Sequence, residues 1–523
     1  MTLKPLGDSA WLVEFPGLSG EVALARVMGL VDALEQSRPA GVLDVVPSFD
    51  SVAVHFEGDV GIKIREWIGS VTVMDRLPNG RLLEIPVCYG REYGPDLEEV
   101  AERTGLTTEE VIALHSGAIY TVAAVGFSPG FPYLLGLPER LRVARRNTPR
   151  LSVPAGSVAV AGGQAGIYPF TSPGGWHLLG RTGINLFDPQ ALRPALLQCG
   201  DRVRFVPVEQ WQPTIPISPV VKSEGVIEVL HPGSLTTVQD LGRPGYESSG
   251  VSPGGAADWH ALRGANLLVG NEEGAAALEI CLSGPVLKFH TETVVALRGK
   301  SRPVAEGETV DFSNLAGGVR ACLAVAGGLR VPTVLGSAAT DLRAGFGGFG
   351  GRALQASDRL STGAPGRIPR CGDWQIGRVN EASFIELRFL AGVQESWFSA
   401  EARRRFRTEF YQLTPSSDRQ GARLSGAELP LTVPREMVSQ PAACGSVQVP
   451  PDGQPIILLA ERQTIGGYPQ IGHVISVDLP KLANARPGTS VRFHEVTWEE
   501  AQTLKRREER EFKWLRTGLE LLK

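Results

Sequence analysis

An internal repeat is the sequence feature that most constrains the fold. Three short segments of the first half recur in the same order in the second half. Gly156–Val160 (GSVAV) resembles Gly445–Val449 (GSVQV), and GIYP at 166–169 resembles GGYP at 466–469. GDRVRF at 200–205 likewise resembles GTSVRF at 488–493. The outer segments begin 44 positions apart in the first copy and 43 in the second, while the middle match shifts. This order predicts a duplicated unit whose copies differ in loop length.

The repeated units are expected to be β-barrels or sandwiches. Glycine and proline make up about a fifth of the 523 residues. They separate short apolar segments such as Val158–Ala161, Val294–Leu297 and Cys322–Val325. Short strands bounded by turn residues are typical of such folds. The predicted fold class is therefore mainly β with α+β parts.

A small α+β unit is expected at residues 1–84. Ala10–Phe15 and Ser51–Phe56 have the pattern of strands, and Glu21–Gln36 has the apolar spacing of a helix. The next unit, 85–208, is predicted to form a β-barrel after two short helices. These helices have capping-box signals at Asp96/Glu99 and Thr107/Glu110, and glycines at 105 and 117 close them.

Three further segments complete the predicted organisation. Residues 209–224 contain three prolines and no periodicity, which predicts a linker. A second β-rich block is expected at 225–497, including the second barrel. From 498 to 523, charged residues alternate with apolar ones, which predicts an amphipathic C-terminal helix.

Charge and composition exclude several classes of partner. The formal net charge is −4, which favours neither nucleic acid nor a membrane surface. The first residues lack the apolar core of a signal peptide, and no run of about 18 apolar residues occurs. Six scattered cysteines fit free thiols in a reducing cytoplasm. The eight histidines show no ligand spacing, so no metal site is predicted.

One candidate site segment is the rigid, irregular run at 126–134 (GFSPGFPYL). Glycine permits positive φ and proline fixes φ, so such a segment can present Ser128 and backbone N–H groups to a ligand. A structural turn that holds aromatic side chains in a core explains the pattern equally well.

The densest polar and aromatic stretch runs from Gly162 to Arg181. Gln164 can donate and accept hydrogen bonds, Tyr168 and His177 can transfer protons, and Arg181 can hold a carboxylate or phosphate. A lone histidine is more often structural, and His177 gains weight only from these neighbours.

A third candidate segment, 236–245, places Gln239, Asp240 and Arg243 within five residues. An Asp–Arg pair that braces a loop is the simpler reading of this segment alone. The segment Glu461–Thr464 and the following loop, with Gln463 and Tyr468, are interpreted as the second-copy counterpart of the Gln164 region. The two Gly-Tyr-Pro loops are therefore expected to face one ligand pocket.

A glycine-rich run at 345–352 (GFGGFGGR) could form an anion-binding nest. Gly347, Gly348 and Gly350 would supply backbone N–H groups, and Arg352 would add positive charge. A tight turn is the alternative. The run matches neither the P-loop nor the Rossmann fingerprint.

These segments resemble a known family. The first half is similar to allophanate hydrolase subunit 1, also called the B-type 5-oxoprolinase subunit or the Kip-type kinase inhibitor. The second half is similar to allophanate hydrolase subunit 2, also called the C-type 5-oxoprolinase subunit. Segments that carry the first resemblance include 5–15 (PLGDSAWLVEF), 126–134 and 172–176, and those that carry the second include 236–246 (TTVQDLGRPGY), 250–255 and 346–354.

The resemblance implies cyclophilin-like β-barrels in both halves and a small N-terminal α+β domain. It also implies a component that acts with a separate A-type subunit to cleave 5-oxo-L-proline to L-glutamate with ATP and Mg²⁺. Under this expectation His177, Asp240, Arg181 and Tyr168 are catalytic candidates, and Gln164, Gln239, Arg243, Gln463, Tyr468 and Ser128 would bind substrate. Gly347, Gly348, Gly350 and Arg352 would bind nucleotide phosphate.

Two alternatives remain open. Related sequences form the carboxyltransferase domain of biotin-dependent urea carboxylase, although this chain has no Ala-Met-Lys-Met biotinylation motif. A non-enzymatic inhibitor of a histidine kinase is the other. The segment 417–424 and Glu461 depart from the usual family pattern, which leaves substrate identity less secure than family membership. The sequence also leaves a homo-oligomer open.

Overall fold

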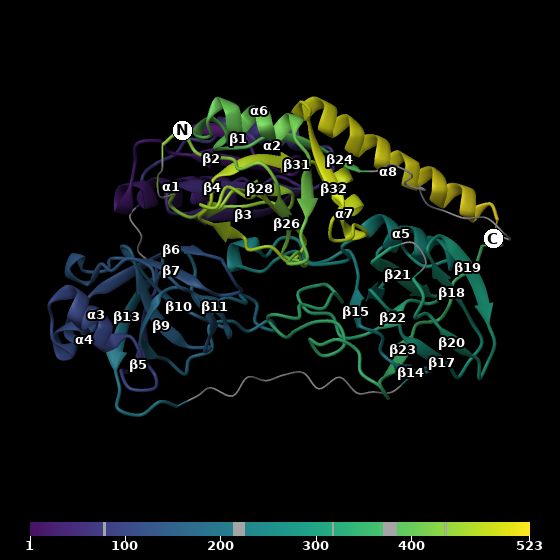
Figure 1. The fold of residues 1–523 in the computed structure, drawn as a ribbon, viewed down its shortest axis with the longest axis horizontal. Helices are drawn as coiled ribbons and strands as arrows, with labels where there is room; N and C mark the ends of the chain where they lie inside the picture. Colours follow the sequence, from purple (N-terminus) through teal and green to yellow (C-terminus); the bar gives the residue numbers. More distant parts are fainter. Residues whose placement is uncertain are drawn as a thin grey trace.

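The computed structural model describes residues 1–76, 80–212, 225–315, 318–369, 384–433, 435 and 437–522. It is mainly β-structure, as predicted, with two closed barrels and three open sheets of four or five strands (Figure 1). Most of the predicted linker, from 213 to 224, lies outside the described residues, as does Cys371. Among the described helices, none is long and apolar enough to cross a lipid bilayer.

The N-terminal unit is a four-stranded antiparallel sheet with strand order β1-β2-β4-β3. Its strands are β1 (Thr2–Pro5), β2 (Ala10–Glu14), β3 (Val42–Ser48) and β4 (Ser51–Phe56). Helix α1 (Gly20–Gln36) and helix α2 (Gly61–Ser70) pack against it through Leu24, Leu30 and Ile64, all at most 1% exposed. The predicted strands and helix are thus present.

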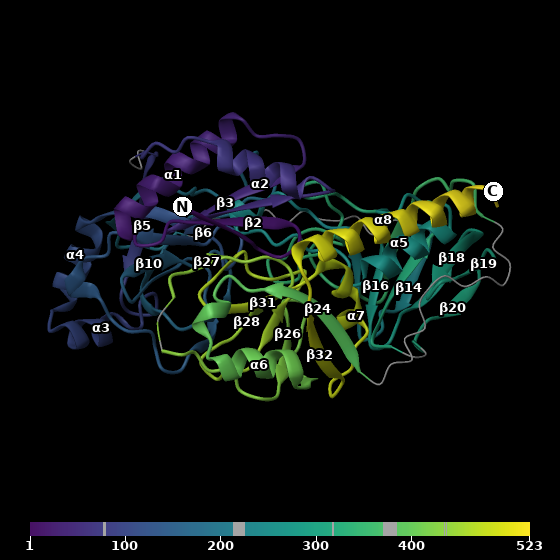
Figure 2. The ribbon, with the colours of Figure 1, turned by 90° about the horizontal axis from the view of Figure 1, so that it is seen from above.

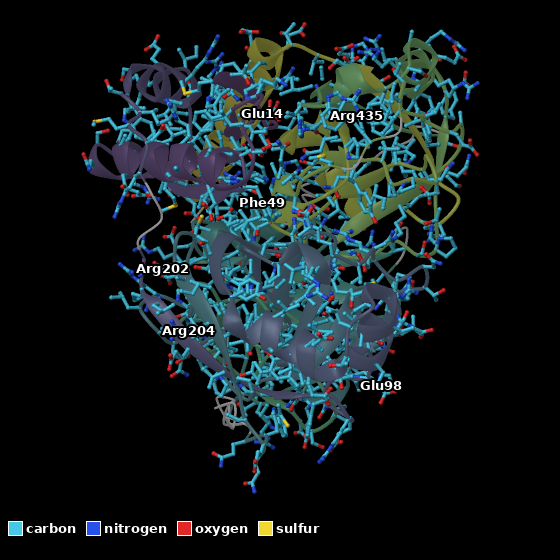
Figure 3. All side chains as sticks on the ribbon, turned by 90° about the vertical axis from the view of Figure 1, so that its left-hand side faces the viewer. Glu14, Phe49, Glu98, Arg202, Arg204 and Arg435 are labelled. Carbon is cyan, nitrogen blue, oxygen red and sulfur yellow. The ribbon has the colours of Figure 1, made fainter. Side chains whose placement is uncertain are left out.

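The first barrel closes through seven strands in the order β10-β7-β6-β13-β5-β12-β9. Their bounds are β5 (Leu82–Tyr89), β6 (Ile119–Val125), β7 (Pro132–Leu135), β9 (Ser157–Ala161), β10 (Gln164–Ile167), β12 (His177–Arg181) and β13 (Arg202–Pro207). A small ribbon of β8 (Arg150–Val153) and β11 (Ser172–Gly174) lies beside them. In Figure 3, Arg202 and Arg204 of β13 lie at the outer side of this barrel.

Two helices precede β6 in this barrel, α3 (Leu97–Thr104) and α4 (Thr108–Gly117). Thr107 and Glu110 form the predicted capping box of α4. The prediction for Asp96 was wrong, because its side chain does not cap α3. It instead accepts hydrogen bonds from the backbone of Leu178 at 2.7 Å and from Arg146 and Arg150.

A double-sheet region follows, formed by residues 225–369. One sheet contains β14 (Ile227–His231), β17 (Val286–Phe289), β20 (Thr309–Asp311), β22 (Leu329–Arg330) and β23 (Arg359–Thr362). The other contains β15 (Leu235–Gln239), β16 (Ala277–Cys281), β18 (Thr293–Leu297), β19 (Lys300–Val304) and β21 (Arg320–Val325). Apolar side chains from both sheets share one core, and helix α5 (Trp259–Leu268) packs on the second sheet.

The second barrel also closes through seven strands, in the order β24-β31-β28-β29-β26-β25-β32. They are β24 (Ile385–Ala391), β25 (Tyr411–Leu413), β26 (Gly421–Ser425), β28 (Ser446–Gln448), β29 (Ile456–Leu458), β31 (Gln470–Val474) and β32 (Ser490–Glu495). Helix α6 (Ala400–Thr408) packs on β32, and β27 (Gln440–Pro441) pairs with β30 (Ile465–Gly466) as β8 does with β11.

The two barrels have the same topology. In each, the first strand pairs in parallel with the last strand, β5 with β13 and β24 with β32. The other five strands follow in the same order with antiparallel pairing. The duplication predicted from the sequence is therefore confirmed. The outer sequence matches fall on equivalent strands, β9 with β28 and β13 with β32.

The middle sequence match was wrong. GIYP at 166–169 begins with the last two residues of β10, whereas GGYP at 466–469 runs from the last residue of β30 to the start of β31. The topological equivalent of GGYP is Gly174-Gly175-Trp176, which runs from the last residue of β11 to the start of β12. Both turns contain two glycines followed by an aromatic residue, and this signal was present in the sequence.

The N-terminal unit packs on both barrels. Phe49 meets Tyr133 of the first barrel with ring centroids 6.0 Å apart (Figure 3). Ser48 donates to the Ser439 carbonyl at 2.6 Å, beside the second barrel. Helix α8 (Trp498–Glu520) then crosses from the N-terminal unit to the double-sheet region (Figure 2). The rings of Trp498 and Trp11 pack with their centroids 5.3 Å apart. The guanidinium carbon of Arg263 lies 3.8 Å from the centroid of the Phe512 ring.

Candidate functional site

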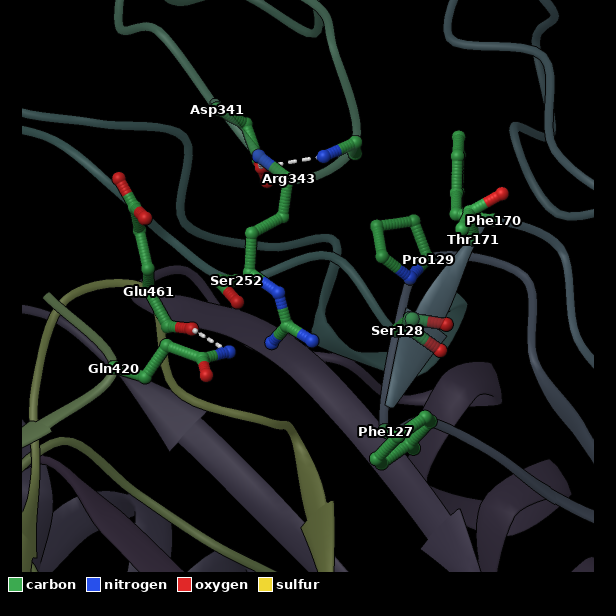
Figure 4. Close-up of a pocket in the computed structure, with 12 residues that line it drawn as sticks. Phe127, Ser128, Pro129, Phe170, Thr171, Ser252, Asp341, Arg343, Gln420 and Glu461 are labelled. Carbon is green, nitrogen blue, oxygen red and sulfur yellow. Dashed lines mark hydrogen bonds between the residues drawn. The ribbon is translucent and has the colours of Figure 1, made fainter. Parts of the chain in front are cut away.

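A cleft opens where loops of both barrels and of the double-sheet region converge (Figure 4). We call it the interbarrel cleft. About 430 Å³ of space lies between its walls, and part of this space is open solvent. Its lining is Phe127–Pro129 and Phe170–Ser172 from the first barrel, Ser252, Asp341, Arg343 and Ala344 from the double-sheet region, and Gln420 and Glu461 from the second barrel.

The loop between β6 and β7 presents Ser128 to the cleft. Phe127 has a φ of 68°, a conformation that is costly for a residue with a side chain. The loop is held by the Phe131 amide, which donates to the Ser128 carbonyl at 3.0 Å, and by the Phe127–Phe131 ring contact at 5.3 Å. The segment therefore holds aromatic side chains in the core and also lines the cleft, so both readings of it apply.

Equivalent loops of the two barrels meet at the cleft. The Gly156 amide donates to the Tyr168 carbonyl at 2.7 Å, and in the second barrel Gly445 donates to Leu458 at 2.8 Å. Tyr168 and Leu458 are therefore equivalent positions. Thr171 and Glu461 each follow three residues later.

The loop between β25 and β26 is likewise equivalent to the Ser128 loop and contributes Gln420. The same two loops of each barrel thus line one cleft, but with different side chains.

Arg343 enters the cleft from a tight loop of the double-sheet region. The Asp341 carboxylate accepts hydrogen bonds from the backbone amides of Arg343 at 3.0 Å and Ala344 at 2.9 Å. Asp341 also forms an antiparallel bridge with Phe346, which closes the loop. In Figure 4 the Arg343 side chain extends from this loop toward Gln420 and Ser252.

A buried ionic network supports the wall formed by Glu461. Arg419 donates through Nε to Glu461 at 2.5 Å and through Nη1 to Glu279. The Nη2 atom of Arg419 donates to the Gly255 carbonyl at 2.6 Å. Burial raises the pKa of Glu461 above its usual range, and Arg419 opposes this shift. The network therefore joins the second barrel to the double-sheet region.

The structure brings Gln239, Asp240 and Arg243 together behind the Asp341 loop. Asp240 accepts hydrogen bonds from the Ser337 hydroxyl and the Ala338 amide, both at 2.6 Å, and Gln239 donates to the Thr340 carbonyl at 3.2 Å. Arg243 donates to the Ala339 carbonyl and stacks on Phe346 at 4.8 Å. These residues brace the segment that carries Asp341 and Arg343, and they do not line the cleft.

Four candidates of the first barrel lie outside the cleft lining. Tyr168 is buried among Phe127, Phe131 and neighbouring rings, and this burial raises its pKa to about 12. Arg181 donates to the Ala155 carbonyl and lies over the Trp211 ring at 4.5 Å. Gln164 is in β10 at the turn from β9.

His177 is buried, and its Nε2 lies 3.0 Å from the Ala144 carbonyl oxygen. Its Nδ1 lies near Glu99 and Asp96, and the three could offer ligand atoms within 4.8 Å of one another. Asp96 is however already paired with Arg146 and Arg150. Two arginines on this carboxylate disfavour a cation at this position.

In the glycine-rich loop, Arg352 and two of the backbone amides already have partners. Arg352 makes a two-bond ion pair with Asp358 at 2.7 and 2.8 Å. The amides of Gly345 and Gly351 are used within the loop. A Cβ on Gly347 would lie 2.1 Å from the Ala339 oxygen, and one on Gly348 would lie 1.9 Å from the Thr340 hydroxyl. Close packing explains these two glycines, and Gly350, like them, has a positive φ.

The segments around Gln463 and Tyr468 adjoin the first barrel. Ile465 is fully buried, and a Cβ on Gly126 would lie 2.3 Å from its side chain. The side-chain amide of Gln463 donates a hydrogen bond to the side-chain oxygen of Gln448 at 3.4 Å. The Tyr468 side chain is 38% exposed. Neither residue lines the cleft, and no residue of 166–169 or 466–469 is in its lining, so the expectation that the two Gly-Tyr-Pro loops face one ligand pocket was wrong.

Sequence reasoning placed Ser128 at the cleft, and it placed the segment 417–424 and Glu461 near the cleft without a role. It did not identify Thr171, Ser252, Asp341 or Arg343 as site residues. Asp341 and Arg343 immediately precede the glycine-rich run, and only the fold shows that they, rather than Arg352, face the cleft.

Comparison with known proteins agrees with this architecture. Residues 1–197 match the model for "Carboxyltransferase domain, subdomain C and D", and residues 249–495 match that for subdomains A and B. The chain therefore belongs to the carboxyltransferase-domain family, with both pairs of subdomains in one polypeptide.

Relatives of each half are separate proteins. The B-type 5-oxoprolinase subunit of Bacillus subtilis is 41% identical over 40% of this chain and 93% of its own length. The C-type 5-oxoprolinase subunit of Escherichia coli is 38% identical over 55% of this chain and 97% of its own length. The chain is thus similar to a fusion of these two kinds of protein.

Solved structures extend the comparison. The crystal structure of TTHA0988 is 37% identical, with a TM-score of 0.81 over 93% of this chain and 99% of that one. The K. lactis urea amidolyase is 28% identical, with a TM-score of 0.52 over 55% of this chain and 20% of the larger protein.

Proposed function

We propose that this chain is the fused B- and C-like component of an ATP-dependent 5-oxoprolinase that acts with a separate A-type subunit. The observation that carries the proposal is the interbarrel cleft, which requires loops from the B-like half and from the C-like half of the chain. Neither half alone provides this lining. A fused chain would fix the pairing of the two halves.

The cleft suits a small polar substrate. Ser128, Thr171 and Gln420 offer hydroxyl and amide groups, and Asp341, Arg343 and Glu461 offer charge. A lactam such as 5-oxo-L-proline has a ring N–H, a carbonyl and a carboxylate that such groups can bind. Opening its ring requires an activated carbonyl carbon, and ATP would supply that activation.

We assign ATP use to the A-type subunit. Arg352 is paired with Asp358, and the amides of Gly345 and Gly351 are used within the loop, so these groups are already engaged and are weak candidates for binding phosphate. We place the activity in the cytoplasm, where ATP is available and where thiols such as Cys88 and Cys322 stay reduced.

The direct test is glutamate formation by the purified chain from 5-oxo-L-proline, ATP and Mg²⁺, with and without the A-type subunit. We expect glutamate and phosphate in equal amounts only when both proteins are present. No glutamate with the combined proteins would refute the proposal. The A-type subunit alone serves as the control.

The second candidate is a carboxyltransferase component of a biotin-dependent urea carboxylase. It is supported by the similarity to the K. lactis urea amidolyase, which covers 55% of this chain. The chain would then need a separate biotin carrier. Urea-dependent ATP turnover that avidin inhibits, in place of 5-oxoproline-dependent turnover, would favour this function.

A further inference from the structure

Arg343 is a cleft residue whose charged group has no direct partner among the described residues. Among the described residues, no ion pair or side-chain hydrogen bond is made by its guanidinium, whereas the nearby Arg419 is held by Glu279 and Glu461. Arg352 is likewise held by Asp358. Its backbone amide is bound by Asp341, so the loop directs the side chain into the cleft without using its charged end. An arginine placed in this way is a ready partner for an anion.

The groups around Arg343 favour a carboxylate over a phosphate. The hydroxyls of Ser128 and Thr171 and the amide of Gln420 can complete the hydrogen bonds of a singly charged ligand. Asp341 and Glu461 line the same cleft, and their carboxylates would repel a phosphate with two charges. The chain segments that line the cleft include neither the N-terminus of a long helix nor the glycine-rich loop, which are the usual sources of phosphate-binding amides.

The opposite charges in the cleft also favour one orientation of a bound ligand. Glu461 is fixed through one oxygen by Arg419, and Asp341 is fixed by two backbone amides. These acceptors suit an N–H group of the ligand, while Arg343 suits its acidic group. A small molecule with a carboxylate at one end and an amide N–H near it matches both.

We propose that Arg343 binds the carboxylate of a small monocarboxylate ligand in the interbarrel cleft and thereby selects it from neutral amides of the same shape. This inference rests on the proposed function, in which the ligand is 5-oxo-L-proline. Arg343 acts here as a binding residue that decides specificity. It is not required for the fold, because its guanidinium makes no described contact that stabilises the protein.

The test compares two lactams on the full chain by isothermal titration calorimetry. The probes are 5-oxo-L-proline and pyrrolidin-2-one, which has the same ring without the carboxylate. The variants are Arg343→Gln and Arg343→Lys, with Arg330→Gln as the matched control, since Arg330 is in β22 of the same region and outside the cleft lining. Thermal unfolding of each variant checks that the fold is kept.

We expect Arg343→Gln to weaken 5-oxo-L-proline binding by about 10- to 100-fold, which corresponds to about 1.4–2.7 kcal/mol. Arg343→Lys should recover part of this loss, and pyrrolidin-2-one binding should not change. Normal binding of 5-oxo-L-proline to a folded Arg343→Gln variant would overturn this inference alone. Equal loss of both lactams would also overturn it. If the unaltered chain, with the A-type subunit present, neither binds nor cleaves 5-oxo-L-proline, the proposed function fails as well.

Discussion

Thr171 and Glu461 occupy equivalent positions in the two barrels, three residues after Tyr168 and Leu458, and both line the same cleft. The duplication therefore supplied the same loop twice to one site. The copies have since acquired different chemistry, with a hydroxyl on one side and a buried carboxylate on the other. The site therefore carries different chemical groups on its two sides, although the two barrels that form it share one fold.

The contact between Gly126 and Ile465 is expected to control how the barrels pack. A Cβ on Gly126 would lie 2.3 Å from the Ile465 side chain, and the backbone at Gly126 does not itself exclude alanine. Gly126→Ala should lower the free energy of unfolding by about 1–3 kcal/mol through overpacking. Urea unfolding measures this loss.

The matched control is Gly117→Ala, where a Cβ meets open space, and this change should be neutral or slightly stabilising. The double variant Gly126→Ala, Ile465→Ala should lose at least about 1 kcal/mol less than the sum of the two single variants. Additive losses would mean that these residues do not limit the approach of the barrels.

Loss of Arg419 is expected to be costly. Arg419→Met would leave Glu279 and Glu461 buried without their cation, and the free energy of unfolding should fall by about 3–5 kcal/mol. Arg404→Met is the control, since Arg404 pairs with Glu401 on the surface and its loss should change the free energy of unfolding far less. Similar losses in chemical denaturation for both variants would contradict the account of the buried network.

Acid should destabilise the first barrel through His115. Burial lowers the pKa of His115 to about 3, while the unfolded chain titrates near its ordinary value of 6.5. Between these values only the unfolded chain binds the proton. The stability that neutral His115 contributes to the folded chain is therefore fully present above pH 6.5 and is lost as pH falls toward 3. The slope should be about 1.4 kcal/mol per pH unit.

The variant that tests this titration is His115→Phe combined with Tyr89→Phe, because Tyr89 bonds to His115 at 2.8 Å and would otherwise lose its partner. Relative to the unaltered chain, the double variant should gain stability as pH falls from 6.5 to 4. Urea unfolding at several pH values gives the difference between the two proteins. A difference that stays constant with pH would show that His115 does not titrate in this way.

Local signals in the sequence were sufficient for much of the fold. The capping box of Thr107 and Glu110, the Ser51–Phe56 strand and the helix from Trp498 depend on neighbouring residues, and all are present. The duplicated barrel could be predicted because the same Gly-Ser-Val sequence leads into β9 and β28, each of which begins at the serine. The middle match failed because a short Gly-Tyr-Pro pattern recurs without a common strand position.

The site depended on contacts between distant segments, and spacing alone could not predict these. Arg243 and Asp240 are close in sequence to each other, yet both brace the backbone of 337–341 instead of binding each other. Arg352 follows the glycine-rich run but pairs with Asp358, while Arg343, which precedes the run, faces the cleft. Only closure of the second barrel beside the first brings Gln420 and Glu461 to Ser128.

The most direct measurement of the central claim is a crystal structure of the chain soaked with 5-oxo-L-proline. We predict ligand density in the interbarrel cleft, with the carboxylate against Arg343 and the ring between Ser128 and Gln420. Density for 5-oxo-L-proline at another place, with the interbarrel cleft containing only water, would contradict the claim that the two barrels build one site.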